Sequence, residues 1–346
     1  MNSYMDRKKV LFLWNIRKEL QFYLNTHLKD IENLELRFTD NLEEDFAPSS
    51  EHIRDADIIV GWRPTKELLL SANRLKLFIN PGVGVQHLIE MFRAVTITRD
   101  IKLINGHGNT YFTAQSAVAL LLALMNKVIP HHNWMAEGKW KRGDEYGKNI
   151  PLRNRTVGIL GYGELGTKIH QFLSGFSVHF LALKTAWGEK DTYPTPLKQF
   201  MPHQLSQFLE EIDILFIAIP LTRLTRNLIG REELDIFTKN KSSLLVNISR
   251  GDVVNEEALY TSLKERRLTG AAIDVWYEYD PKPDKEDRKY PYHYPFHELD
   301  NIVLSPHRAA SPFDDLERWD EVIENIKRFC KGRIDYLNIV DLEREY

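Results

Sequence analysis

A glycine-rich stretch in the middle of the chain reads Thr156-Val157-Gly158-Ile159-Leu160-Gly161-Tyr162-Gly163-Glu164-Leu165-Gly166. Its apolar first half is typical of a strand, and the residues after it have a helical pattern. Gly161 permits a tight turn, Gly163 lets the backbone approach a pyrophosphate, and Gly166 allows the helix to pack closely on the strand. The spacing alone also fits an ordinary turn of an α/β protein. Its setting between strand and helix favours a dinucleotide-binding loop, with Glu164 and Leu165 among its contacts at the start of the helix.

Short apolar runs alternate with helical patterns on both sides of this loop. Before it the predicted strands are Val10–Trp14, Leu34–Arg37, Asp57–Val60, Leu75–Asn80 and Lys102–Asn105, and after it they are Val178–Leu183, Ile214–Ile219, Ser243–Ile248, Ala271–Asp274 and Ile302–Leu304. A long apolar helix, Thr113 to about Val128, separates the two series and is expected to stop near Pro130. Strands alternating with helices predict parallel sheets covered on both faces. A chain of 346 residues is too long for one core, so we predict an α/β fold of two doubly wound parallel-sheet domains.

The composition excludes several classes of partner. Hydrophobic residues make up 43% and charged residues 27% of the chain, which is ordinary for a globular protein. The net charge of -3 provides no basic field for a nucleic acid. The apolar run Val10–Trp14 is too short for a signal peptide or a membrane span, and the single cysteine, Cys330, favours a reducing compartment. We therefore expect a cytoplasmic protein, and we expect no metal because no His/Cys cluster has the spacing of a metal site.

Beyond the glycine loop, the sequence resembles the D-isomer-specific 2-hydroxyacid dehydrogenases, especially the glyoxylate/hydroxypyruvate reductases. The blocks that carry the resemblance are Pro81-Gly82-Val83-Gly84-Val85, Thr113-Ala114-Gln115-Ser116-Ala117-Val118-Ala119, Pro220-Leu221-Thr222 with Thr225, Asn247-Ile248-Ser249-Arg250-Gly251, Ala271-Ala272-Ile273-Asp274-Val275, Ser305-Pro306-His307, and Asn325-Ile326 through Gly332 to Asn338-Ile339-Val340-Asp341. Their order and spacing make the resemblance specific, although the family usually has Glu where Gln115 stands.

The resemblance implies an architecture. A discontinuous, flavodoxin-like substrate-binding domain would comprise residues 1–110 and 312–346, and an inserted Rossmann domain for the dinucleotide would comprise residues 111–311. The active site would lie in the cleft between them, and the protein would be a homodimer joined largely through the dinucleotide domains. The function implied is hydride transfer between NAD(P)H and a small 2-keto acid or D-2-hydroxy acid. The alternative is a dinucleotide-sensing regulatory or binding protein with little turnover.

Reduction of a 2-keto acid requires a carboxylate clamp, polarisation of the carbonyl and a proton donor. Arg250 suits the first two, because a guanidinium fork pairs with a carboxylate and reaches the keto oxygen. His307 suits the third, because an imidazole titrates near working pH. The family places a Glu beside this histidine, immediately before a proline, whereas here Tyr279 occupies the matching position between Glu278 and Asp280. Either carboxylate could be the partner, or neither could reach the ring; Glu278 is the choice we favour.

The remaining site residues follow from the resemblance. The Val83 and Gly84 amides would hold the substrate carboxylate. Asp274 would accept a hydrogen bond from the nicotinamide carboxamide, and the cofactor would also be lined by Pro220, Thr225 and Ile248. Arg308 could add charge to the pocket or pair with a nearby carboxylate. The aromatic side chains of the loop 277–294 are expected to pack on one another or on another subunit rather than to line a substrate pocket.

Cofactor choice depends on the end of the second strand of the dinucleotide fold, where an acidic residue would bond the adenine ribose and repel a 2′-phosphate. Here the strand Val178–Leu183 is followed by Lys184 and Thr185, with no Asp or Glu in it. Lys184 could donate to the phosphate, with the Thr185 hydroxyl as a second donor. We therefore expect NADP(H) to be favoured, with NAD(H) possible.

Overall fold

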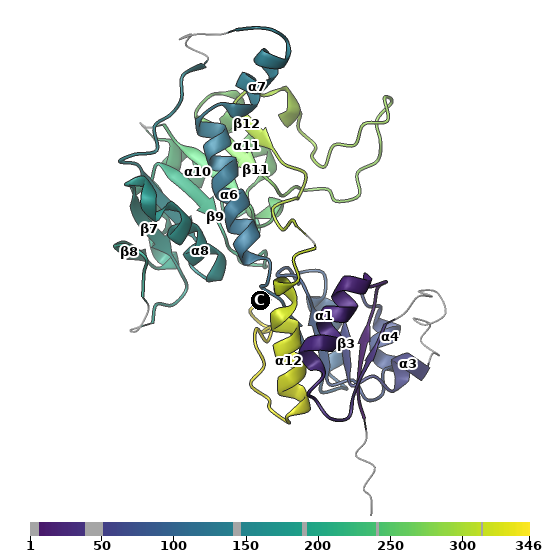
Figure 1. Cartoon of the computed structure of the whole chain (residues 1–346). Coiled ribbons are helices and arrows are strands. Elements are labelled where there is room, and N and C mark those ends of the chain that lie inside the picture. Colours follow the sequence, from purple (N-terminus) through teal and green to yellow (C-terminus); the bar gives the residue numbers. More distant parts are fainter. Residues whose placement is uncertain (1–6, 39–50, 141–146, 189–191, 240–241, 313) are drawn as a thin grey trace, which may run out of the picture. The chain divides into compact units, whose positions relative to one another are not determined.

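The computed structural model describes residues 7–38, 51–140, 147–188, 192–239, 242–312 and 314–346 (Figure 1). The chain divides into two compact units. Unit 1 comprises Met1–Asn109 and Pro312–Tyr346, and unit 2 comprises Thr110–Ser311. The chain therefore leaves unit 1 once, forms unit 2, and returns to unit 1 at its C-terminal end.

The described part of unit 1 contains a five-stranded sheet in the order β2-β1-β3-β4-β5. The strands are β1 (Lys8–Phe12), β2 (Leu34–Arg37), β3 (Ile58–Val60), β4 (Leu77–Asn80) and β5 (Lys102–Asn105). All neighbouring strands are parallel. This is the flavodoxin-like order, in which the strand order reverses between β1 and β3.

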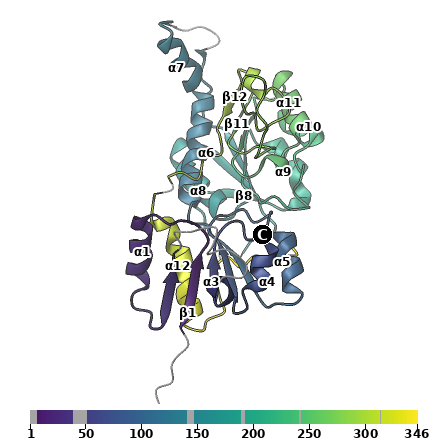
Figure 2. The same cartoon turned by 90° about the vertical axis from the view of Figure 1, so that its right-hand side faces the viewer.

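Helices cover both faces of this sheet. They are α1 (Lys18–Leu28), α3 (Glu51–Arg54), α4 (Lys66–Ser71), α5 (Ile89–Thr96) and α12 (Asp320–Cys330). One core lies under α1 and α12, which neighbour each other (Figure 2), and a second lies under α3, α4 and α5. The helix α1 buries Leu20, Leu24 and Leu28, which recur every four residues and so share one face. The tail after α12 reaches the edge of the sheet, where the Val340 N–H donates to the Leu103 carbonyl at 2.9 Å.

The described part of unit 2 contains a seven-stranded sheet in the order β12-β11-β10-β9-β6-β7-β8. The strands are β6 (Thr156–Leu160), β7 (His179–Leu183), β8 (Leu197–Phe200), β9 (Ile214–Ile217), β10 (Leu244–Asn247), β11 (Gly270–Ile273) and β12 (Ile302–Leu304). All neighbouring strands are parallel. This is the Rossmann order with β12 added at one edge, and its switch point lies between β6 and β9. The prediction of two doubly wound parallel-sheet domains is confirmed.

The helices of unit 2 also form two layers. They are α6 (Thr110–Met125), α7 (Val128–Ala136), α8 (Glu164–Leu173), α9 (Leu205–Glu211), α10 (Arg231–Thr238) and α11 (Glu256–Lys264), with the short 3₁₀ turns η2 (Ser174–Phe176), η3 (Pro202–Gln204), η4 (Gly251–Val253) and η5 (Phe296–Glu298). One core includes buried residues of α6 and α8, and the other lies under α9, α10 and α11. Pro130 does not stop the helix as expected, because it falls in the first turn of α7, where a missing N–H costs nothing.

Among the described residues, no single helix is long and apolar enough to cross a membrane. The helices α6 and α7 meet the length and composition criteria only together, and they are bent by 64° at the break between them. The first of the two buries Ala114, Ala117 and Leu121 in the core of unit 2.

Candidate active site

The glycine loop joins β6 to α8 at the switch point of unit 2. Gly161 has φ +97°, which favours glycine, and a Cβ atom there would lie 2.5 Å from the Ala218 carbonyl oxygen. A Cβ on Gly166 would lie 2.3 Å from the Gly161 carbonyl oxygen. A Cβ on Gly163, the N-cap of α8, would meet nothing within 4 Å. Two glycines are therefore required by packing, and the third leaves open space at a helix N-terminus, which suits a pyrophosphate.

Arg250 lies just beyond the carboxyl end of β10 and is held by the residue that ends this strand. The buried Asn247 side chain accepts hydrogen bonds from the Ser249 N–H at 3.1 Å and the Ser249 hydroxyl at 3.0 Å. Its amide nitrogen donates to the Arg250 carbonyl at 3.0 Å. One guanidinium nitrogen of Arg250 donates to the Ser249 carbonyl at 2.6 Å. The turn therefore fixes the backbone from which the guanidinium projects.

Asp274 follows β11 and anchors the segment that carries His307. Its carboxylate is 1% exposed and accepts hydrogen bonds from the Ser305 hydroxyl, the Arg308 N–H at 2.8 Å and the Ala309 N–H at 2.9 Å. These contacts flank His307, whose φ of +56° lies in the left-handed region. The two carboxylate oxygens offer about four acceptor positions, so at least one is left for a ligand. The expected bond to a nicotinamide carboxamide stays a prediction.

His307 makes its hydrogen bond to Tyr279. The tyrosine hydroxyl lies 2.9 Å from His307 Nδ1, and the two rings meet edge to face with centroids 5.3 Å apart. The same hydroxyl accepts a long hydrogen bond of 3.4 Å from the Trp276 N–H. The Trp276 indole in turn donates to the Ser305 carbonyl at 2.8 Å. Two hydrogen bonds, from Trp276 to Ser305 and between Tyr279 and His307, thus connect the segment after β11 to the segment after β12.

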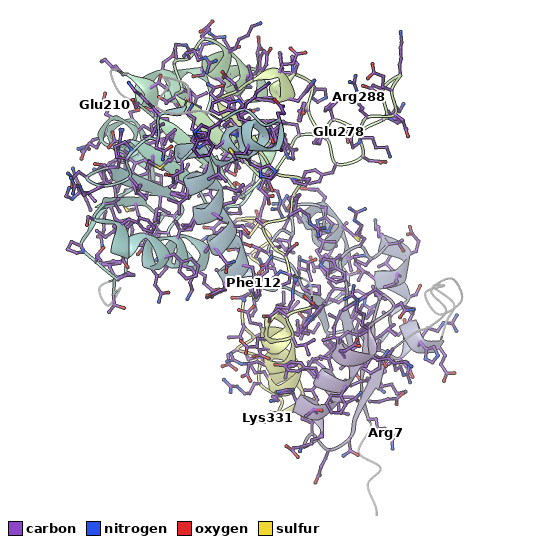
Figure 3. All side chains as sticks on the ribbon, turned by 45° about the horizontal axis from the view of Figure 1, so that its top comes forward. Arg7, Phe112, Glu210, Glu278, Arg288 and Lys331 are labelled. Atoms are coloured by element: carbon purple, nitrogen blue, oxygen red, sulfur yellow. The ribbon has the colours of Figure 1, made fainter. Side chains whose placement is uncertain are left out.

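The expectation that Glu278 is the partner of His307 is corrected by this geometry. Glu278 is exposed on the extended loop that also carries Arg288 (Figure 3), and its carboxylate accepts the Asp280 N–H at 2.9 Å. Among the described residues, neither Glu278 nor Asp280 makes a hydrogen bond or ion pair with His307, which is the third of the arrangements left open by the sequence. The physical cause is the loop backbone, because the Tyr277 and Glu278 N–H groups both donate to the Pro291 carbonyl, at 3.1 and 3.0 Å.

The electrostatics of the site connect Arg250, Tyr279 and His307. Desolvation by the surrounding protein and the positive charge of Arg250 lower the pKa of His307 below its usual 6.5, while Asp274 opposes that change. Desolvation also lowers the pKa of Arg250, which stays charged at neutral pH. Desolvation raises the pKa of Tyr279, whereas the Trp276 N–H and Arg250 act to lower it. The histidine is therefore biased toward its neutral form.

The predicted substrate loop of unit 1 follows β4 and is held by two buried asparagines that sequence reasoning missed. Asn80 and Asn105 are register partners at the ends of β4 and β5. The Asn80 amide donates to the Gly82 carbonyl and, at 3.4 Å, to the Gly84 carbonyl, and the Asn105 amide donates to the Val83 carbonyl at 2.8 Å. Within the described residues, the Val83 and Gly84 N–H groups have no hydrogen-bond acceptor. Because the carbonyls of this loop accept hydrogen bonds from the two asparagines, the Val83 and Gly84 N–H groups can donate to a bound anion.

The remaining predicted cofactor residues lie at strand ends of unit 2. Lys184 follows β7, with its ammonium 5.5 Å from the centroid of the Trp187 ring, and Thr185 beside it is exposed. The Thr225 hydroxyl donates to the Pro220 carbonyl at 2.7 Å and so closes the loop after β9. Ile248 is 5% exposed and belongs to the core between α6 and the sheet. These residues follow β7, β9 and β10, at the carboxyl edge of a parallel sheet.

Tyr162 of the glycine loop belongs to a buried network that the sequence did not indicate. Its hydroxyl lies 2.7 Å from His170 Nδ1, and His170 Nε2 lies 2.8 Å from the Thr195 hydroxyl. Trp187 and Tyr193 pack against the Tyr162 ring, with centroids at 5.6 and 5.9 Å. Burial lowers the pKa of His170 to about 4. The network attaches the segment after Lys184 to the loop and to α8.

Most aromatic side chains of the loop after β11 pack on the protein. Trp276 contacts Tyr292 with centroids 4.9 Å apart, and Tyr260 stacks on Tyr294 at 5.3 Å. Several of them join the core under α9, α10 and α11. The expectation of self-packing is met for these residues, and Tyr279, which is 56% exposed, is the exception.

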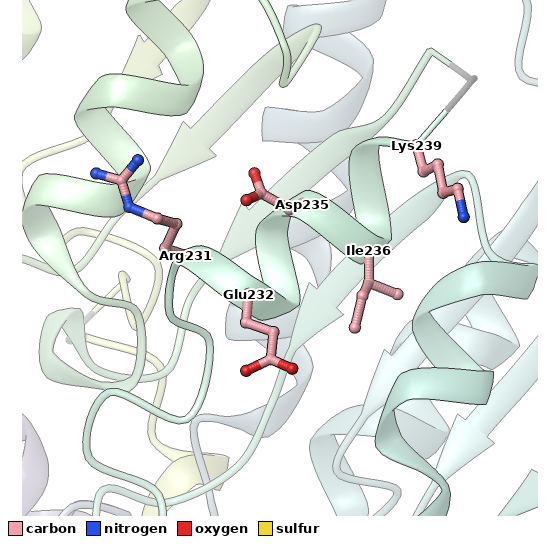
Figure 4. A pocket seen from close by; sticks show the side chains of 5 residues that line it. All are labelled: Arg231, Glu232, Asp235, Ile236 and Lys239. Carbon is pink, nitrogen blue, oxygen red and sulfur yellow. The ribbon is translucent and has the colours of Figure 1, made fainter.

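Two surface hollows lie away from the residues of this site. A hollow along α10 (Figure 4) is lined by Arg231, Glu232, Asp235, Ile236 and Lys239, and a hollow in unit 1 is lined by residues 96–102 and 339–343. Neither includes a residue predicted to bind substrate or cofactor. Within the ranges that the structure describes, no group of three or more His, Cys, Asp or Glu side chains could hold a metal ion.

Unit 2 has a Rossmann sheet with a glycine loop at its switch point and a polar cluster at nearby strand ends. These features define the class of protein as a nicotinamide-dinucleotide oxidoreductase. A family model described as D-isomer specific 2-hydroxyacid dehydrogenase, NAD binding domain, matches residues 118–309. A glyoxylate reductase of Korarchaeum cryptofilum is 31% identical over 326 residues, which cover 88% of this chain and 91% of that protein.

Solved structures have the same fold. A D-isomer specific 2-hydroxyacid dehydrogenase from Xanthobacter autotrophicus, in complex with NADPH and MES, has a TM-score of 0.77 at 22% identity and covers 98% of this chain and 100% of that chain. An NADPH-dependent glyoxylate/hydroxypyruvate reductase from Sinorhizobium meliloti has a TM-score of 0.74 at 23% identity and covers 97% of this chain and 98% of that chain.

The chain belongs to the D-isomer specific 2-hydroxyacid dehydrogenase family. It is a dehydrogenase that acts on 2-keto or 2-hydroxy acids with a nicotinamide dinucleotide, so the predicted family and reaction class are confirmed. The alternative of a dinucleotide-sensing protein with little turnover is not favoured.

Proposed function

We propose that this enzyme reduces a small 2-keto acid of the glyoxylate or hydroxypyruvate type, with NADPH preferred over NADH. The observation that carries the proposal is the hydrogen bond between Tyr279 and His307, which follows β12, together with the positive charge of Arg250, which follows β10 and acts on both side chains. Support for the substrate comes from the 31% identical glyoxylate reductase. Arg250 and His307 both lie at the carboxyl edge of the parallel sheet of unit 2, which is where α/β proteins bind their ligands.

Arg250 and His307 divide the chemistry between them. The Arg250 fork pairs with the substrate carboxylate and polarises the keto oxygen, since its planar donors match both acceptors. When bound, the dinucleotide supplies the hydride. His307 gives the proton to the oxygen as negative charge develops there. The same imidazole, in its neutral form, accepts the proton when a 2-hydroxy acid is oxidised.

Unit 1 binds the substrate through the loop after β4, with the Val83 and Gly84 amides donating to the carboxylate. The hydrogen bonds from Asn80 and Asn105 to the carbonyls of this loop support the proposal, because they fix the backbone that carries the two amides. Two backbone N–H groups on adjacent residues form a small anion-binding concavity. The role carries over to unit 1 as a whole, which we assign as the substrate-binding domain.

Unit 2 binds the dinucleotide. The residues at the N-terminus of α8, where Gly163 leaves open space, would hold its pyrophosphate; they are Gly161, Gly163, Glu164, Leu165 and Gly166. Lys184 and Thr185 hold the 2′-phosphate of the adenine ribose, while Pro220, Thr225, Ile248 and Asp274 line the nicotinamide half. Lys184 supports the preference for NADP(H), because a cation in this position attracts a phosphate that an acidic residue would repel.

The protein works in the cytoplasm as a homodimer, with no nucleic acid, membrane or metal partner. A single cysteine in the chain supports a reducing compartment. The homodimer follows the pattern of similar proteins, which join largely through the dinucleotide unit.

The test is turnover with a panel of 2-keto acids, comprising glyoxylate, hydroxypyruvate, pyruvate and bulkier acids. His307→Ala and Arg250→Ala should leave the fold and dinucleotide binding nearly intact while kcat falls by about 10²- to 10⁴-fold. Arg250→Lys should also be poor, because a point charge does not reproduce the fork. A His307→Ala enzyme that reduces every acid at the normal rate would refute the mechanism.

A further inference from the structure

The partner of the proposed proton donor is a neutral side chain. The Tyr279 hydroxyl lies 2.9 Å from His307 Nδ1, and the ring edge adds a second contact, with an interplanar angle of 74°. The Glu278 carboxylate, next to Tyr279 in the same loop, instead accepts a hydrogen bond from the Asp280 N–H at 2.9 Å. The loop therefore presents a phenol to the imidazole, and no carboxylate among its described residues makes a hydrogen bond to the ring.

We propose that Tyr279 is the positioning residue of His307, and that its hydroxyl holds the imidazole in place without supplying a negative charge. This inference rests on the proposed function, since it assigns a partner to the proposed proton donor. A hydroxyl suits both states of the ring. It donates to Nδ1 when that nitrogen is unprotonated, and it accepts the Nδ1–H when the ring is an imidazolium.

The neighbours of Tyr279 support a positioning role. The Trp276 N–H donates to its hydroxyl, and the Trp276 indole is bonded to the Ser305 carbonyl, two residues before His307. The tyrosine oxygen is thereby located relative to the segment that it contacts. Asp274, on the other side, accepts the Arg308 and Ala309 amides. Tyr279 and Asp274 thus restrain the side chain and the backbone of the same residue.

The pH titration of His307 can show whether its partner is neutral or negatively charged, because nearby charges shift that titration. The charged groups that act on it are Arg250, which disfavours the imidazolium, and Asp274, whose carboxylate already serves the Ser305 hydroxyl and two amides. A glutamate at position 279 is shorter than the tyrosine, and it would place a negative charge within about 4–6 Å of Nδ1. An opposite charge at that range moves a titration by about one to three pH units.

The experiment compares Tyr279→Phe and Tyr279→Glu with the matched controls Tyr290→Phe and Glu278→Gln. Tyr290 lies in the same loop, and its ring stacks on His297 at 4.2 Å. The imidazole signals of His307 are followed by NMR against pH, with His307→Gln for assignment, and the pH profile of kcat for glyoxylate reduction is measured alongside.

Tyr279→Glu should move the NMR titration of His307 and the high-pH fall of kcat upward by about one pH unit or more. Tyr279→Phe should change the His307 signals and lower kcat roughly 2- to 10-fold, the cost of one hydrogen bond, without changing dinucleotide binding. Both controls should match the unmodified protein.

Two results would overturn the inference. One is a downward move of the His307 titration in Glu278→Gln, which would mean that this carboxylate reaches the ring. The other is Tyr279→Phe with unchanged His307 signals and unchanged kcat. If Tyr279 variants alter the His307 signals while His307→Gln keeps full activity, the contact stands and the proposed proton donor is wrong. The NMR measurement thus separates the two failures.

Discussion

Gly251 and Trp276 pack backbone against backbone, so closely that a Cβ atom on Gly251 would lie 2.4 Å from the Trp276 carbonyl oxygen. Gly251 directly follows Arg250, and Trp276 precedes Tyr279 by three residues. This contact sets the separation between the segment after β10 and the segment after β11. Close packing at a glycine therefore helps to place the residues that act on His307.

We expect Gly251→Ala to disturb the site through the backbone. The added methyl cannot fit without a shift of one of the two segments, and overpacking of this kind costs about 1–3 kcal/mol of stability. A displacement near 1 Å at reacting groups costs up to about 10²-fold in rate. Urea unfolding and kcat/KM would measure both effects. Gly175→Ala is the control, because a Cβ there meets nothing within 4 Å; equal behaviour of the two variants would contradict the prediction.

Asn105→Ala should weaken binding of the 2-keto acid and leave the dinucleotide unaffected. The Asn105 amide holds the Val83 carbonyl at 2.8 Å, so its loss frees the loop that presents the proposed carboxylate donors. One hydrogen bond is worth about 0.5–1.5 kcal/mol, which predicts a rise in KM of roughly 2- to 10-fold. The control is Asn25→Ala, which removes a similar bond, 2.8 Å to the Gln21 carbonyl, on α1. An unchanged KM would show that this loop does not hold the substrate.

The buried His170 should make the protein less stable at acidic pH. Its folded-state pKa of about 4 lies below the ordinary value of 6.5, so the unfolded chain binds the proton more readily between these values. Stability is therefore full above pH 6.5 and is lost as the pH falls toward 4. One pH unit corresponds to about 1.4 kcal/mol, so the loss between pH 7 and 5 is about 2 kcal/mol.

His170→Gln removes this titration while leaving groups that can bond Tyr162 and Thr195. The free energy of unfolding, measured by urea at pH 7 and pH 5, should fall more for the unmodified protein than for the variant. The comparison cancels the contribution of the other histidines. An equal fall in both proteins would mean that His170 is protonated in the fold without penalty.

The sequence predicted the sheets well because most strands are buried runs of apolar residues. It missed β8, because Leu197, Lys198 and Gln199 do not form an apolar run. This strand lies at the edge of the sheet, where polar side chains can remain exposed. Within the site, Arg250 and His307 stand in recognisable motifs at strand ends. Which of residues 278–280 faces His307 could not be predicted, because hydrogen bonds to Pro291, thirteen residues beyond Glu278, set the direction of the loop.

Asn80 and Asn105 carried a signal that could have been used. Each is a polar residue that ends a strand directly after two or three apolar residues, and parallel strands bring such ends to one edge of the sheet. The Tyr162–His170–Thr195 network carried none. Its members are eight and twenty-five residues apart in sequence, and only the packing of α8 against the loop before β8 brings them together.

Lys184→Asp should reverse the cofactor preference. A lysine and a phosphate about 4 Å apart attract by about 4 kcal/mol at an effective dielectric of 20. Solvent exposure leaves about 1–2 kcal/mol of that, which is roughly 5- to 30-fold in affinity. The ammonium already lies near the end of β7, 5.5 Å from the Trp187 ring, which packs on Tyr162 of the glycine loop. An aspartate there would repel the 2′-phosphate and bond the ribose hydroxyls of NADH.

The measurement is the dissociation constant of each dinucleotide, by quenching of tryptophan fluorescence, with kcat/KM for both reductants. Lys264→Asp makes the same charge change on the exposed side of α11 and serves as the control for net charge. The variant at Lys184 should bind NADPH roughly 5- to 30-fold more weakly and NADH as well or better, while the control keeps the original ratio. An unmodified protein that binds NADH as tightly as NADPH would mean that the charge at the end of β7 does not read the phosphate, and that backbone contacts in the glycine loop alone hold the cofactor.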